Sequence, residues 1–177
     1  HAVHGEGGHF FMQLWHVGRV SHPDFQKGKT PVAPSAIDPG GHSLTPHGKK
    51  RMVIPRKLAQ EDIDRIIEDF VIAGENAMNA GCDGVEIHAA NGYLFHQFFA
   101  NSGNQRTDRY GGSDEDKARF LFEVIDAMTK RIPVERIGIR LNPMMDGHVG
   151  IHVDEATAGT FDYIVNKLNE YSLAYLH

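Results

Sequence analysis

The side chains best suited to chemistry follow residues 84–88, a short apolar run. His88 closes the run, and Asn91 and Tyr93 follow within five residues. In α/β barrels and open α/β sheets, substrates and cofactors bind at the carboxyl ends of parallel strands. An imidazole, an amide and a phenol at such an end can grip a polar oxygen and supply a proton. The pattern therefore predicts a reaction site here.

Each of these residue types also has a plainer role. A histidine at a strand end is more often a hydrogen-bonded structural residue than a catalytic one. Tyr93 and Trp15 could simply pack, because aromatic rings bury large areas. Gln13 and Arg140 each lie near the end of another predicted strand, and singly they are ordinary polar side chains. Only their shared context makes them candidates for binding a cofactor.

Parallel strands are needed to bring these side chains together, and the chain predicts them. Buried strands are predicted at residues 9–16, 84–88 and 137–141, and a further strand starts at Leu173. Residues 17–55 are interrupted by many prolines and glycines, which predicts a long loop over the body of the protein. Loops of that length often cover an active site.

Helices are predicted between the later strands. Apolar residues recur at helical spacing over residues 63–77, and Gly81 suits the left-handed turn that ends such a helix. Ser113 stands three residues before an aspartate, like a capping box, and predicts the start of the next helix. A last helix is expected to open at Asp154 or Glu155. The alternation of strand, loop and helix predicts an α/β fold with a parallel sheet and right-handed crossovers.

Composition limits the possible functions. The 177 residues are 41% hydrophobic and 23% charged, with no apolar run near the roughly 18 residues that span a bilayer, so no membrane partner is expected. The formal charge of −5 is spread along the chain, whereas nucleic-acid binding needs a clustered basic face. The single cysteine, Cys82, excludes a disulfide framework and favours a reducing, cytoplasmic location.

Twelve histidines raise the question of a metal site. The nearest approaches to ligand spacing are His1 with His4, and Glu86 with His88. Zinc needs three or four converging ligands, and the chain has no His-Glu-x-x-His or Cys-x-x-Cys pattern, so no metal is predicted. The glycines of residues 5–8 precede a strand, whereas a dinucleotide-binding fingerprint follows one.

Four ordered motifs resemble a known family. They are residues 11–19, 85–94, 104–113 and 138–141, and in order and spacing they resemble the Old Yellow Enzyme family of FMN-dependent ene-reductases. The resemblance covers nearly the whole chain. It implies a (β/α)₈ TIM barrel of which only a part is present, namely the third to fifth strands with their helices and the start of the sixth. Residues 1–177 would then form a single partial-barrel, FMN-binding domain.

The resemblance implies FMN as the cofactor and NADPH or NADH as the reductant. Gln13 matches the family's amide that hydrogen-bonds to the polar edge of the flavin, and Arg140 matches the arginine beside its pyrimidine end. A cation there would stabilise the negative charge that reduction places near N1 and O2 of the flavin. His88 is expected to contact both the cofactor and the substrate.

The same resemblance implies how a substrate is held. His88 and Asn91 match the paired donors that grip the oxygen of an enone or a phenol, Tyr93 matches the proton donor to the α-carbon, and Trp15 corresponds to an aromatic wall of the pocket. Two donors on one oxygen withdraw electron density, so the β-carbon can accept hydride. The implied cycle is ping-pong, with small enones, quinones or nitro compounds as acceptors, in a monomer or homodimer. Some members carry histidine at both donor positions, and this difference is expected to affect substrate preference.

The motif at residues 104–113 is expected to be structural even within this family. Arg106 and Asp108 can pair locally, and Gly111 and Gly112 supply a tight entry to the next helix.

Two alternatives stay open. A complete barrel of this kind takes about 250 residues, so the first alternative is a truncated, catalytically inactive fragment that cannot hold FMN on its own and exposes open sheet edges. The second is a different barrel that uses Glu86 and His88 in metal-assisted hydrolysis, which leaves Gln13, Arg140 and Tyr93 unexplained.

Overall fold

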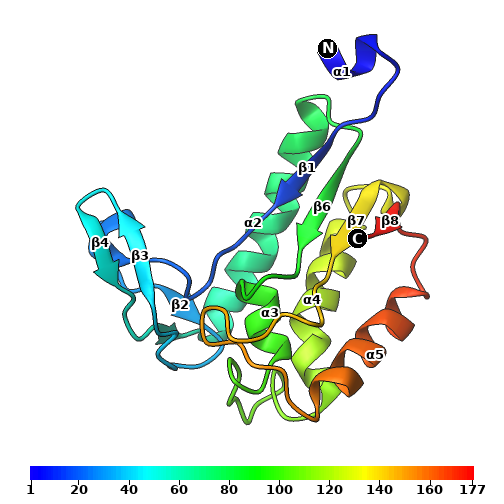
Figure 1. Ribbon diagram of the computed structural model, residues 1–177. Helices are drawn as coiled ribbons and strands as arrows, with labels where there is room; N and C mark the ends of the chain where they lie inside the picture. Colours follow the sequence, from blue (N-terminus) through cyan, green and yellow to red (C-terminus); the bar gives the residue numbers. More distant parts are fainter.

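The computed structural model describes residues 1–177 and is built around a parallel four-stranded sheet (Figure 1). In their order across the sheet the strands are β1 (Phe11–Leu14), β6 (Gly84–His88), β7 (Ile137–Arg140) and β8 (Tyr175–Leu176). Every neighbouring pair is parallel, so the carboxyl ends of the strands lie at one edge of the sheet.

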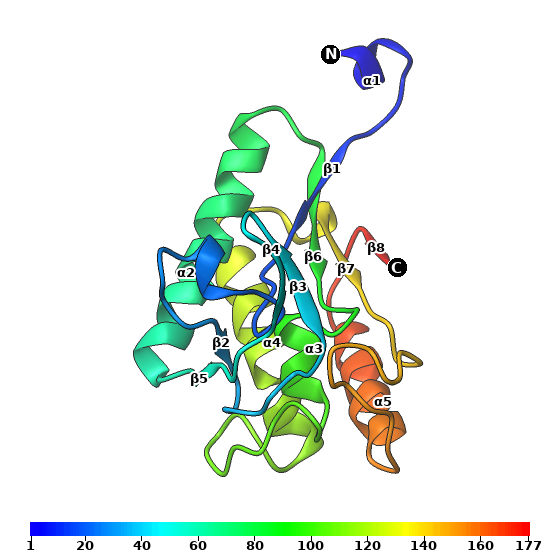
Figure 2. The ribbon, with the colours of Figure 1, turned by 60° about the vertical axis from the view of Figure 1, so that its left-hand side comes forward.

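Three long helices lie along one side of this sheet (Figures 1 and 2). They are α2 (Gln60–Asn79), α4 (Asp114–Met128) and α5 (Thr157–Leu168), and each follows a strand or precedes the next one. Four shorter helices complete the set: α1 (Ala2–Gly5), η1 (Pro23–Phe25), α3 (Leu94–Phe99) and η2 (Val134–Arg136). No helix combines the length and the apolar composition that crossing a bilayer requires.

The core lies between the sheet and the long helices. Side chains alternate along a strand, and Val85, Ile87, Ile137 and Ile139 are fully buried in the apolar cluster shared with the helices. The intervening positions on β6 and β7 are Glu86, His88 and Arg140, which therefore face the other side of the sheet. The sheet thus has one apolar face packed against the helices and one face that carries polar side chains.

Local signals fix where the predicted helices begin and end. The hydroxyl of Ser113 accepts a hydrogen bond from the backbone N–H of Asp116 at 3.1 Å, which confirms the predicted cap of α4. Gly81 has a φ of 90°, which confirms the left-handed turn after α2. The prediction that the last helix opens at Asp154 or Glu155 was wrong, because α5 begins two or three residues later, at Thr157. Asp154 instead accepts hydrogen bonds from the Thr157 hydroxyl and the Ala156 backbone, and α5 starts after it.

The prediction of a long loop at residues 17–55 was wrong in part, because short elements interrupt the irregular backbone. This segment holds η1, the strand β2 (Val32–Ala33), and a hairpin of β3 (His42–Thr45) and β4 (Gly48–Arg51) that stands out from the body in Figure 1. β2 pairs in parallel with β5 (Arg56–Lys57). These strands are two to four residues long and largely polar, so they show no apolar period in the sequence.

The first predicted strand is shorter and less buried than expected. β1 spans four residues, and only Leu14 among them is buried. Met12 is exposed, and so is Trp15, the residue that follows β1. The reason is that β1 is an edge strand that pairs with β6 alone. The third strand ends one residue early, at Arg140, and the last begins at Tyr175 rather than Leu173.

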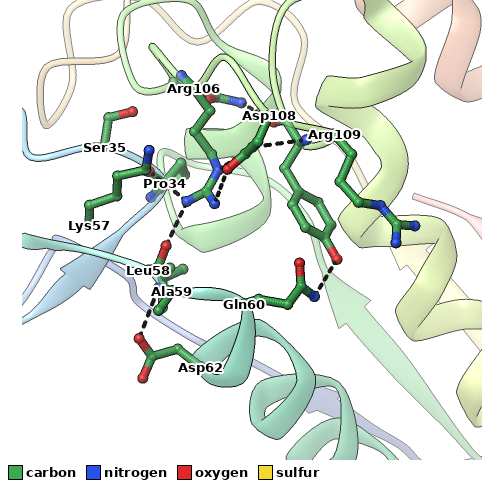
Figure 3. Close-up of polar contacts among 12 residues, drawn as sticks. Pro34, Ser35, Lys57, Leu58, Ala59, Gln60, Asp62, Arg106, Asp108 and Arg109 are labelled. Atoms are coloured by element: carbon green, nitrogen blue, oxygen red, sulfur yellow. Dashed lines mark hydrogen bonds and ion pairs between the residues drawn. The ribbon is translucent and has the colours of Figure 1, made fainter.

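The predicted pairing of Arg106 with Asp108 is confirmed (Figure 3). The Arg106 side chain is only 3% exposed and donates to both carboxylate oxygens of Asp108. It also donates to the backbone carbonyls of Pro34 and Leu58, at 3.1 and 2.7 Å. The guanidinium therefore ties the turn before α4 to the segments that lead into and out of the hairpin region.

Candidate active site

Three of the residues singled out in the sequence meet at the carboxyl ends of β1 and β6. The ring centroids of Trp15 and Tyr93 are 4.7 Å apart, those of His88 and Tyr93 5.3 Å, and those of Trp15 and His88 6.0 Å. Trp15 comes directly after β1, His88 ends β6, and Tyr93 precedes α3. Parallel pairing of β1 with β6 is what brings residues about 75 positions apart into one aromatic cluster.

Asn91 occupies the turn between β6 and α3. Its backbone has a φ of 56°, a left-handed conformation that asparagine tolerates better than most residues, and Gly92 follows with a φ of 77°. The side-chain oxygen of Asn91 accepts a hydrogen bond of 2.9 Å from the amide of Asn142, the second residue after β7. The Asn91 side-chain nitrogen keeps both of its donors free. Asn142 was not identified from the sequence.

Gln13 and Glu86 face each other on the polar side of the sheet. They are register partners, and the Gln13 amide donates a hydrogen bond of 2.5 Å to Glu86. The other carboxylate oxygen of Glu86 lies 3.0 Å from the His177 ring. Burial raises the pKa of Glu86, but the hydrogen bonds from Gln13 and His177 outweigh it and the net pKa is lowered. From the sequence, Glu86 was a candidate only as a metal ligand, although its position two residues before His88 on the same strand places both side chains on one face of the sheet.

Arg140 ends β7 opposite His88, its register partner on β6. Its half-buried guanidinium makes no ion pair or hydrogen bond within the chain. The pKa of His88 is lowered, first by burial and then by the positive charge of Arg140, with Glu86 opposing. The His88 ring is therefore neutral at neutral pH. Its Nδ1 atom is buried and has no hydrogen-bond partner.

The known proteins that this chain resembles are flavin oxidoreductases. The model of the NADH:flavin oxidoreductase / NADH oxidase family matches residues 1–177. The chain is 43% identical to 12-oxophytodienoate reductase 2 of Arabidopsis thaliana over 182 residues, covering 99% of this chain and 47% of that protein. It is 45% identical to 12-oxophytodienoate reductase 1 of Oryza sativa subsp. japonica over 172 residues, covering 96% and 43%.

Solved structures agree. Morphinone reductase in complex with tetrahydroNAD superposes with a TM-score of 0.92 at 44% identity, over 99% of this chain and 50% of that one. An Old Yellow Enzyme homologue from Zymomonas mobilis gives a TM-score of 0.93 at 39% identity, over 99% and 48%. The chain belongs to the NADH:flavin oxidoreductase / NADH oxidase family, which confirms the Old Yellow Enzyme resemblance and the partial TIM barrel. It spans about half the length of the curated relatives it matches.

The residues on the polar face fit FMN, the family's cofactor. Arg140 is a cation with no anionic partner, and the flavin ring develops negative charge on reduction. Gln13 donates to Glu86 through its nitrogen, which leaves its amide oxygen as an acceptor for an N–H of a ring. The unpartnered Nδ1 of His88 shows that this face has a buried polar atom still to be satisfied. No group of three or more His, Cys, Asp or Glu side chains is placed to hold a metal ion.

Proposed function

We propose that this chain carries the site of an FMN-dependent oxidoreductase that uses NADPH or NADH to reduce the activated C=C bonds of enones, or related acceptors such as quinones and nitro compounds. The observation that carries the proposal is the meeting of His88, Tyr93 and Trp15 at the strand ends, beside the unpaired Arg140. Residues 1–177 would act as one partial-barrel, FMN-binding domain.

Bound FMN would supply the hydride, and the chain's own residues would prepare the acceptor. Gln13 and Arg140 would hold the polar edge of the ring from β1 and β7, the two strands that flank β6. A neutral His88 has one N–H to donate to a carbonyl oxygen and adds no net charge to the site. Asn91 is held through its oxygen by Asn142, so its two N–H donors remain available for the same oxygen. Together the pair would polarise the conjugated double bond.

Tyr93 is suited to deliver the proton. Its hydroxyl has no hydrogen-bond partner within the chain, and its ring is held between Trp15 and His88. A phenol in that position can act as a general acid and pass its proton to the α-carbon of the acceptor. Trp15, with 53% of its surface exposed, would form the wall against which the acceptor lies.

Reductant and acceptor would occupy the same surface in turn, which gives a ping-pong order. The complex of morphinone reductase with tetrahydroNAD supports a nicotinamide at this surface. The physiological acceptor would be a small molecule, because His88 and Asn91 would donate hydrogen bonds to only one of its oxygen atoms. The proposal is made for the whole protein, because this chain spans about half the length of its curated relatives.

A second candidate is that the 177-residue chain by itself is an inactive fragment. Two observations favour it: β1 and β8 each pair on one side only, and an apolar hollow of about 650 Å³ lies between α5 and β8. Open sheet edges and uncovered apolar surface invite association with a complementary piece.

Visible absorption spectroscopy separates the two candidates. We expect the protein that carries this site to show a flavin spectrum and a new long-wavelength band when a simple phenol is added. A flavin spectrum with no such band, and no NAD(P)H-dependent loss of an enone, would contradict the proposed function. Failure of the isolated 177-residue chain to bind added FMN would support the fragment candidate.

A further inference from the structure

We propose that His96 and Gln97, adjacent on α3, are positioning residues that orient Asn91 and Tyr93. The inference rests on the proposed function, since it assigns a task to residues that support that site. Both side chains are buried, with exposures of 2% and 0%. Neither was singled out in the sequence.

The two side chains hold both backbone polar groups of Gly92. The N–H of Gly92 donates to Nδ1 of His96 at 3.2 Å, and the Gly92 carbonyl accepts from Nε2 of Gln97 at 2.7 Å. The first group belongs to the peptide between Asn91 and Gly92, and the second to the peptide between Gly92 and Tyr93. Because each peptide unit is planar, fixing one atom of each sets the backbone angle that aims Asn91 and the one that aims Tyr93.

The backbone itself closes this turn with one hydrogen bond, from the N–H of Tyr93 to the carbonyl of Ala90 at 3.2 Å. Asn91 and Gly92 are both in the left-handed region, and glycine has more conformational freedom than any other residue. That bond leaves both polar groups of Gly92 without a backbone partner. Within the chain, the hydrogen bonds from α3 are the ones that hold the two polar groups of Gly92.

Gln97 also ties this turn to the segment that follows Trp15. Its Nε2 donates to the carbonyl of Val17 at 3.1 Å, and its Oε1 accepts from the backbone N–H of Arg19 at 3.1 Å. Gly18 lies between these two contacts, with a φ of 59°, and a Cβ there would collide with the Gln97 amide. One amide therefore fixes the turn carrying Tyr93 against the segment carrying Trp15, and so sets the contact between the two rings.

The acceptor role of His96 requires an unprotonated Nδ1. Burial lowers the pKa of His96 to about 4, so the ring is neutral at neutral pH. The aromatic rings that lie against it are those of Phe99 and Phe161, and no carboxylate faces it. The hydrogen bond from Gly92 requires an unprotonated Nδ1, and the apolar surroundings of His96 keep that atom unprotonated.

A matched pair of variants tests the proposal. His96→Phe keeps a ring and removes the acceptor, whereas His96→Asn replaces Nδ1 with an amide oxygen bonded to the same carbon. In the FMN-loaded protein we expect His96→Phe to lower the rate of enone reduction about tenfold relative to the rate of flavin reduction by NADPH, and His96→Asn to restore most of that ratio. Gln97→Met, which keeps the shape of the side chain, should lower the ratio as well.

His22→Phe is the control. His22 Nδ1 accepts from the backbone N–H of Asp24 at 3.1 Å, the same kind of bond, but it caps η1 rather than the site turn. The His22→Phe variant should leave the ratio of enone reduction to flavin reduction unchanged. If His96→Phe and His22→Phe change the ratio equally, or if His96→Phe changes neither rate, the positioning role is wrong.

A second measurement does not depend on flavin. In NMR spectra of the 177-residue chain, amide exchange at Gly92 should be about tenfold faster in His96→Phe than in the wild type, and the nuclear Overhauser contacts between the Trp15 and Tyr93 rings should weaken. Unchanged exchange and unchanged contacts would overturn the proposal. If the wild type reduces no acceptor but these NMR changes occur, the proposed function fails while the orienting contacts stand. If His96→Phe does not fold, the same measurements on Gln97→Met and His96→Asn decide.

Discussion

The amide nitrogen of Gln13 donates a 2.5 Å hydrogen bond to the Glu86 carboxylate, across the first pair of strands in the sheet. The bond fixes which end of the Gln13 amide faces outward, because the nitrogen is committed and the oxygen is left free. Glu86 at the same time meets His177, which directly follows β8. One carboxylate thus joins three strands on the polar face and presets the amide proposed to meet the flavin.

Replacing Tyr93 with Phe should slow acceptor reduction by roughly 100-fold, because a positioned general acid contributes on that order. Flavin reduction by NADPH should stay nearly unchanged, since no proton from Tyr93 is needed there. Stopped-flow absorbance of the two half-reactions measures both. Phenylalanine keeps the ring contacts with Trp15 and His88, so equal slowing of both half-reactions would remove Tyr93 from the proton-donor role.

The pKa of His88 should move in opposite directions in two variants. Burial is the main cause of its lowered pKa, and Arg140 lowers it further while Glu86 raises it. Arg140→Met should therefore raise the pKa towards its usual value, and Glu86→Gln should lower it further. NMR titration of the His88 ring protons measures both shifts. Shifts of the same sign in the two variants would contradict this account of the electrostatics.

Acid should destabilise the fold through His96. Its pKa is about 4 in the folded state against 6.5 ordinarily, so between these values the unfolded chain binds a proton that the folded chain does not. Stability therefore falls as the pH drops, by about 2 kcal/mol between pH 7 and pH 5 from this group alone. Urea denaturation at the two pH values measures the loss. His96→Asn should show a loss smaller by that amount, and an identical loss would exclude His96 as the source.

Replacing Arg106 with Met should destabilise the chain by about 3 kcal/mol, because buried backbone carbonyls would be left without a hydrogen-bond donor. The carbonyls of Pro34 and Leu58 would lose their donor (Figure 3). Arg109→Met is the matched control, because Arg109 is 58% exposed and pairs with Glu123 at the surface, and it should cost less than about 1 kcal/mol. Chemical denaturation compares them, and similar losses would show that burial of Arg106 contributes little.

The sequence by itself determined the elements whose signals are local. The apolar period over residues 63–77, the Ser113 cap and the glycine at position 81 correctly located α2 and α4, because these depend on contacts within a few residues. The ordered motifs also identified the family and the partial barrel. The six proposed site residues came from the same motifs, and their roles remain proposals.

Only the tertiary structure decided how the strand ends meet. Register placed Gln13 against Glu86 and His88 against Arg140, and no feature of either strand alone specifies its partner. The hairpin of β3 and β4, the helix α3 and the bonds from His96 and Gln97 to Gly92 went unseen for the same reason. Their stability comes from contacts with distant segments, such as Gln97 with Val17, and a linear pattern does not record which distant residues become neighbours.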